Sequence, residues 1–150
     1  MKFDDTFHVW GRLQASKGFD KEDIGISWGD QIDVLSGAHI GKIGMVGIPG
    51  TVEVYDGGKV DHLDMCATSG ALTVFSGGVV GSVICYLGKI TVKRGGLVTS
   101  ADITNGAKLT VYSGGMVTEI TKTSRAELDI RKGGIVTNIK TEDLNDENEA

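Results

Sequence analysis

The chain has 150 residues, of which 23 are glycine and one is proline, and its formal net charge at pH 7 is −5. Glycine is about twice as frequent as in an average protein, but the three-residue glycine period of collagen is missing. The hydrophobic fraction of 40% is too high for a disordered linker. The sequence has no run of 18 apolar residues, which is the length that could span a membrane. Composition and length therefore favour one folded domain that does not insert into a membrane.

The negative charge is concentrated at the C-terminal end of the sequence. Residues 1–141 contain 15 acidic and 15 basic side chains, so the whole deficit comes from residues 142–150. We expect these last residues to form an acidic disordered tail. The neutral body offers no basic face for phosphate groups, so we expect no nucleic-acid binding.

Residues 1–30 are predicted to form an N-terminal cap with a degenerate first coil. They show no secretory signal, because no apolar segment with a small-residue cleavage site follows the start. They contain five of the nine aromatic residues of the chain, and these form either a hydrophobic plug over the first coil or an attachment surface. The five aromatic residues are Phe3, Phe7, Trp10, Phe19 and Trp28.

Residues 31–141 carry a repeat of about 19 residues, which contains a valine or isoleucine, two intervening residues and then a pair of glycines. The first glycines of successive copies are spaced 20, 20, 18, 19 and 19 residues apart. Apolar residues recur five and three positions before this glycine, and three, six and eight positions after it. In the copy around Gly77 they are Leu72, Val74, Val80, Val83 and Cys85.

The spacing of these apolar positions predicts strands joined by corners. A spacing of two is typical of a strand with alternating inward and outward side chains, whereas the spacing of three interrupts the alternation and indicates a corner. The glycine pair is a second corner, where one residue needs a positive φ. A third corner lies near Gly29, Gly50, Gly70, Gly88 and Gly106.

Three short strands and three corners in each repeat predict an all-β fold, a parallel β-helix of about six to seven coils over residues 31–141. A single coil cannot bury its apolar face, but stacked coils share one core. A left-handed helix of hexapeptide repeats is the alternative geometry, although the variable spacing fits it poorly.

The repeats resemble the 19-residue stalk repeats of AIDA-type autotransporter adhesins. Residues 107–121, Ala-Lys-Leu-Thr-Val-Tyr-Ser-Gly-Gly-Met-Val-Thr-Glu-Ile-Thr, are the clearest copy. The resemblance implies a right-handed β-helix that serves as an extended stalk on bacterial surfaces. It also implies serine and threonine side chains that a partner glycosyltransferase can modify.

One group of titratable residues, Asp61, His62 and Asp64, could be interpreted as a catalytic site on a coil face. We expect solvated surface instead, because adjacent coils carry Gly81-Ser82 and Thr99-Ser100 there and offer no second pair of carboxylates. We therefore predict a protein that is not an enzyme and has no catalytic residues, cofactor or metal site.

We expect the remaining histidines and the cysteines to have structural positions and no catalytic role. His8 and His39 have no partners nearby in the sequence and are expected at the surface. Cys85 takes an inward position, where a free cysteine acts as a small hydrophobic residue. Cys66 should point the other way, so a disulfide between the two is not favoured.

Two outward columns suggest an interaction surface. The column two residues before the first glycine is rich in aromatic residues, and the column two residues after it is apolar in the C-terminal half. An exposed apolar stripe often marks a contact surface; alternatively, the second column tucks under the corner. The candidate residues are Leu35, Tyr55, Phe75 and Tyr112 in the first column, and Val79, Leu97, Met116 and Ile135 in the second.

These observations predict a structural or interaction protein, a rigid spacer or a display and self-association surface of a bacterial adhesin or phage fibre. We expect a homo-oligomer or another protein partner, with a host glycan or receptor as a candidate ligand. The expected location is the bacterial cell surface or the exterior if a signal was removed. The alternatives are a cytoplasmic or virion-associated protein, such as a bactofilin-like scaffold, and a β-helical carbohydrate-active enzyme.

Overall fold

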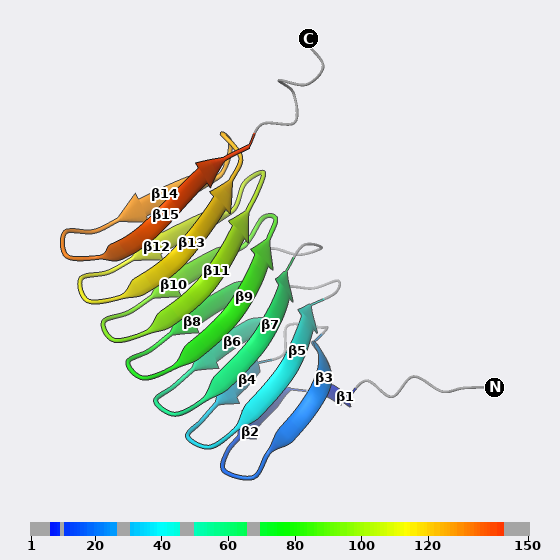
Figure 1. Ribbon diagram of the computed structural model, residues 1–150. Coiled ribbons are helices and arrows are strands. Elements are labelled where there is room, and N and C mark those ends of the chain that lie inside the picture. Colours follow the sequence, from blue (N-terminus) through cyan, green and yellow to red (C-terminus); the bar gives the residue numbers. More distant parts are fainter. Residues whose placement is uncertain (1–6, 10, 27–30, 46–49, 66–69, 143–150) are drawn as a thin grey trace.

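The computed structural model describes residues 7–9, 11–26, 31–45, 50–65 and 70–142. These residues form strands and turns without a helix, and the strands build two parallel sheets that face each other (Figure 1). The predicted fold class is confirmed: the protein is a β-solenoid of about six turns of about 19 residues.

Each coil contributes one strand to each sheet. The short sheet contains four-residue strands: β2 (Arg12–Ala15), β4 (Gln31–Val34), β6 (Thr51–Val54), β8 (Ala71–Val74), β10 (Lys89–Val92), β12 (Lys108–Val111) and β14 (Glu127–Ile130). The long sheet contains the three-residue β1 (Phe7–Val9) and seven-residue strands: β3 (Asp20–Ile26), β5 (His39–Met45), β7 (Lys59–Met65), β9 (Val79–Cys85), β11 (Leu97–Ile103), β13 (Met116–Lys122) and β15 (Ile135–Thr141).

The prediction of three strands in each coil is wrong in one respect. The predicted corner between the third and sixth positions after the glycine lies inside the seven-residue strand and does not end it. In β11, for example, Leu97, Val98 and residues 100–103 pair with β13, while Thr99 is left out of the register. One unpaired residue is therefore enough to change which side chains face inward.

The predicted apolar columns form the core. Residues at equivalent positions pair side by side, as Ile90 does with Leu72 and Leu109 in the short sheet. From Ile32 to Ile120 the five predicted columns are buried, and the largest fully buried side chains belong to them. Burial of each coil therefore depends on the coils stacked above and below it.

Glycine is required at the two positions of each pair for different structural reasons. The first glycine has a φ between 80° and 88° in every coil from Gly18 to Gly133, as predicted for this corner. The second glycine packs against the preceding coil, since a Cβ on Gly96 would lie 2.6 Å from the carbonyl oxygen of Val74. A side chain is thus excluded at the first position by backbone conformation and at the second by close packing.

The first glycines also form a hydrogen-bond ladder along the solenoid. The amide of Gly77 donates to the carbonyl of Gly95, which lies in the next coil. Just after β10 the donor direction is opposite, because the amide of Lys93 donates to the carbonyl of Val74 in the preceding coil. The glycine corner, on the left in Figure 1, is therefore a third ladder that ties the coils together.

The remaining corner contains a buried column of small residues seven positions before the first glycine. Gly106, predicted to belong to this corner, lies one residue before the column and is exposed, whereas Ala107 takes the buried position. Next to Ala107, Asn105 has a φ of 52°. The buried column contains Gly50, Gly70, Gly88, Ala107 and Ala126.

In the N-terminal region, β2 pairs with β4 and β3 pairs with β5. Leu13 and Ala15 pair with Ile32 and Val34, in the register that the 19-residue spacing predicts. Phe19 is partly buried and packs against the core. Phe3, Trp10, Trp28 and residues 143–150 lie outside the described residues, as does the side chain of Phe7, so the cap and the tail stay predictions.

Candidate interaction surface

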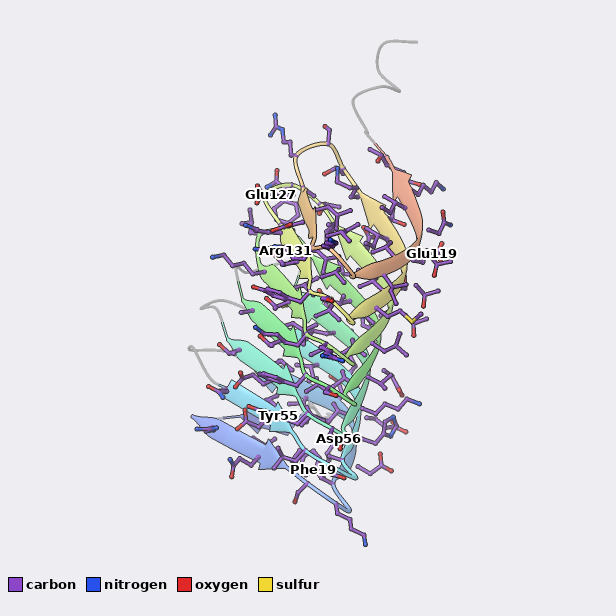
Figure 2. All side chains as sticks on the ribbon, turned by 90° about the vertical axis from the view of Figure 1, so that its left-hand side faces the viewer. Phe19, Tyr55, Asp56, Glu119, Glu127 and Arg131 are labelled. Atoms are coloured by element: carbon purple, nitrogen blue, oxygen red, sulfur yellow. The ribbon has the colours of Figure 1, made fainter. Side chains whose placement is uncertain are left out.

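The aromatic column predicted two residues before the first glycine forms a ladder on the outer face of the short sheet. We call it the outer ladder. It lies along the edge next to the glycine corner and extends from the region of Tyr55 to that of Arg131 (Figure 2). Its members are Leu35, Tyr55, Phe75, Lys93, Tyr112 and Arg131, and all except Arg131 are partly buried.

The side chains of the outer ladder cover one another's faces. The rings of Tyr55 and Phe75 are stacked, with centroids 4.7 Å apart and an interplanar angle of 2°. Further along, Nζ of Lys93 lies 4.5 Å from the ring centroid of Tyr112, and Cζ of Arg131 lies 5.2 Å from it. Stacking and cation–π contacts of this kind stabilise neighbouring coils against one another.

The adjacent outward column, four residues before the first glycine, contains two buried polar residues. Asp33 is only 1% exposed and Thr110 is 8% exposed. The guanidinium of Arg12 donates to Oδ2 of Asp33 at 2.6 and 2.8 Å, and Gln31 donates to Oδ1 at 2.8 Å. Long side chains from neighbouring positions therefore cover this column, which the alternation of the sequence alone could not show.

The electrostatic setting of Asp33 favours its ionised form. Burial alone would raise the pKa of this carboxyl, but hydrogen bonds from Gln31, Arg12 and Gln14 together lower it. The carboxylate thus connects β4 to Arg12 and Gln14 on β2, and Gln31 of β4 extends this network by donating to Glu53 on β6.

The apolar column two residues after the first glycine is half exposed. We call it the corner ridge, and it consists of Val79, Leu97, Met116 and Ile135, which pair in register along the long sheet. Val79 and Leu97 are partly buried, Met116 is 36% exposed and Ile135 is 47% exposed. Exposure thus increases toward the C-terminal coil. Val79 and Leu97 tuck partly under the corner, whereas Met116 and Ile135 are exposed.

The same column is charged in the N-terminal half of the solenoid. Here it contains Asp20, His39 and Lys59, and His39 is not the isolated surface residue that the sequence predicted. Nδ1 of His39 lies 3.0 Å from Asp20, and Nε2 lies 2.8 Å from Asp61. Its hydrogen bonds with Asp61 and Asp20 raise its pKa above 6.5.

In the group Asp61, His62 and Asp64, the first two residues have different partners. Asp61 pairs with His39 and lies 3.9 Å from Nζ of Lys59, whereas Nδ1 of His62 lies 2.6 Å from Oγ of Ser82 in the next coil. Among the described residues no cluster of three or more histidine, cysteine or acidic side chains could hold a metal ion. The stretch therefore belongs to the polar face of the long sheet.

Cys85 occupies the predicted inward position. It is fully buried and free, and burial raises the pKa of its thiol to about 11. A thiol with this pKa is protonated at neutral pH, as expected for a residue that only packs in the core. Cys66 lies outside the described residues.

With this geometry in hand, comparison with known proteins gives one informative result. No model of a known protein family matches the sequence, and no curated protein matches it. Among solved structures, the chain is similar to a crystal structure of a TibA fragment that carries TibC-catalysed hyper-glycosylation. The two chains are 26% identical, with a TM-score of 0.61 over 87% of this chain. The fold resembles an adhesin-like stalk.

The similarity to the TibA fragment concerns the solenoid itself. It covers 56% of the length of that fragment, so this chain spans just over half of it. The part of the chain that the structure describes has no helix that could cross a membrane. The outer ladder and the corner ridge lie on the sides of the solenoid, which is the part that resembles the TibA fragment.

Proposed function

We propose that the chain is a rigid segment of a bacterial surface stalk, which holds other parts of an adhesin or fibre apart and displays its own sides to partners. The observation that carries this proposal is the continuous stacking of coils by two sheets and the glycine ladder. The likeness to the TibA fragment supports it. We propose no enzymatic activity, cofactor or metal.

The outer ladder supports the mechanical part of this proposal. Because the rings of Tyr55 and Phe75 are stacked on each other, one face of each ring is covered and not open for stacking with a sugar. The same holds for Tyr112, whose ring is near cations from the coils on both sides. The ladder is therefore better suited to stiffening the rod than to binding a glycan by its ring faces.

The corner ridge supports self-association as the second part. Met116 and Ile135 are its most exposed members, and their apolar side chains would bury additional surface against a second copy. A light-scattering measurement of mass tests this: we expect a dimer or larger assembly, and Met116→Asp should shift it toward the monomer. A wild-type chain that is strictly monomeric at micromolar concentration would refute the proposed self-association.

Exposed threonines support a glycosyltransferase as a partner. Thr99, Thr118 and Thr137 are 19 residues apart, are all exposed, and lie at the unpaired position of their strands. The TibA fragment was hyper-glycosylated by TibC. Co-expression with that enzyme, followed by intact-mass and peptide spectrometry, should add sugars at these threonines, and an unmodified chain would contradict this part.

The stalk proposal itself is tested by shape. Small-angle scattering of the purified chain should give the cross-section of a single stiff rod whose length matches the stacked coils, at about 4.8 Å for each coil. Insertion of the segment between two reporter domains should increase their separation by the same length. Open-ended filaments in negative-stain micrographs would instead favour the bactofilin-like scaffold.

A further inference from the structure

The imidazole of His39 lies between two carboxylates from the coils on either side of it. Nδ1 is 3.0 Å from Oδ1 of Asp20 on β3, and Nε2 is 2.8 Å from Oδ2 of Asp61 on β7. One side chain on β5 therefore links three consecutive strands of the long sheet, outside the apolar core.

The protonation state of the imidazole decides whether both links can exist. A neutral imidazole has one N–H and donates to only one carboxylate, while the lone pair of the other ring nitrogen faces the second carboxylate. An imidazolium donates from both nitrogens. The two short distances at His39 therefore fit the charged form.

The surrounding charges act in both directions. Lys59 on β7 pairs in register with His39 and lies 3.9 Å from Asp61, so it opposes a charge on the ring. Lys21 and Glu22 follow Asp20 on β3, and Lys42 lies further along β5. Two hydrogen-bonded carboxylates outweigh the opposing ammonium group, which agrees with the raised pKa of His39.

The strand held by this arrangement lies near an end of the solenoid. Among the described residues, the outer side of β3 pairs with the three residues of β1, and that pairing covers Ile24–Ile26. It does not extend to residues 20–23, where Asp20, Lys21 and Asp23 pair with β5. Loss of a side-chain link is expected to increase local opening here more than in the interior.

We propose that Asp20, His39 and Asp61 form a proton-operated clamp that holds β3 against β5 and β7 when the imidazole is charged and loosens this end of the solenoid when it is neutral. The clamp is complete below pH 6.5, the ordinary pKa of histidine. It is lost as the pH rises through the higher pKa of the folded state. This end of the solenoid would then close below the pKa of the folded state and open above it.

Native-state hydrogen exchange followed by NMR tests the clamp on the whole chain. After correction for intrinsic exchange, amides of β3 should be about two- to fivefold more protected at about pH 6 than at about pH 8.5, as expected for an exposed ion pair. His39→Gln should remove this difference. His62→Gln is the matched control and should keep it, because His62 lies one strand further along the long sheet and contacts Ser82.

A second measurement needs no substitution. An NMR titration of the wild-type ring should place the pKa of His39 above 6.5, and Asp20→Asn should lower it. A wild-type pKa at or below 6.5, equal protection of β3 at the two pH values, or an unchanged pH dependence in His39→Gln would each overturn the proposal. The titration decides the matter if the His39 variant does not fold.

Discussion

The interior coils and the last coil carry the same repeat but bury it differently. Val111 and Ile120 are fully buried, whereas Ile130 and Ile139, one coil further along, are 38% and 45% exposed. The residue types are nearly the same and each coil keeps its register with the preceding one, so the difference comes from the following coil that covers it. Among the described residues, no strand pairs with the outer edges of β14 and β15.

This comparison shows where the stability of a solenoid resides. In a compact domain a residue is buried by its own surroundings, but here a coil supplies only one side of its own burial and the next coil supplies the other. The same substitution should therefore have a large effect in the interior and a small effect at the ends. Four measurements can test this difference between the interior and the end coils.

The largest effect is expected for a core truncation. Ile120→Ala should lower the free energy of unfolding by about 3 kcal/mol, because it leaves a cavity between covered coils. Ile139→Ala should cost less than about 1 kcal/mol, since its side chain is already partly exposed. Urea unfolding followed by circular dichroism measures both, and equal losses would contradict the comparison.

The glycine corner should show the next largest difference. Gly95→Ala places a Cβ at a φ of 80° and 2.5 Å from Oγ of Ser76 in the preceding coil. Gly18→Ala meets a similar φ of 88° but nothing within 4 Å. We expect losses of about 2–3 kcal/mol and about 1–2 kcal/mol in thermal unfolding, because the left-handed conformation alone accounts for the smaller value. A larger loss for Gly18→Ala would show that crowding at the corner is unimportant.

The outer ladder should couple neighbouring coils more weakly. A double-mutant cycle with Tyr55→Leu and Phe75→Leu should give a coupling energy of about 0.5–1.5 kcal/mol from the stacked rings. The equivalent cycle between Tyr112 and Arg131, which reaches the last coil, should give about 0.5 kcal/mol. Denaturant midpoints of the four proteins in each cycle measure these values, and additive losses in the first cycle would refute coupling by stacking.

The smallest difference is expected between Asp33 and Asp129 in how they affect the stability of the fold at acidic pH. Asp33 has a pKa below its ordinary value of 3.8 in the folded chain, so its stabilising effect is complete above that pH and is lost as the pH falls through the folded value. Asp33→Asn should therefore flatten the loss of stability between about pH 5 and 2. Asp129→Asn in the last coil is the control, because Asp129 is partly exposed and Nε of Arg131 is its partner at 2.9 Å. An equal change in both variants would show that burial of Asp33 is irrelevant.

Much of the fold follows from the sequence because the repeat aligns residues that touch. Once Gly77 and Gly95 are placed in one column, Val80 and Val98 must pair, and their burial follows from the inward alternation. The number of strands does not follow, because a corner can be made by one unpaired residue such as Thr99 without ending the strand.

The side-chain interactions of the surface were harder to predict for a physical reason. The partners of His39 lie 19 and 22 residues away, so a search along the sequence finds none. Alignment of the column as Asp20, His39, Lys59 would have indicated the contact with Asp20, because a carboxylate and an imidazole then stand side by side. The burial of Asp33 depends on how Arg12 extends over it, and neither repeat spacing nor residue type determines that conformation.

The glycine corner also allows the length of the solenoid to change by whole repeats. Since Gly77 and Gly95 have the same backbone conformation and the same place in the ladder, removal of residues 77–94 would join Ser76 to Gly95 and recreate an identical corner. The strands on each side would meet partners of the same spacing. Recombination between repeats can therefore change the reach of the rod in steps of about 4.8 Å without redesigning its core.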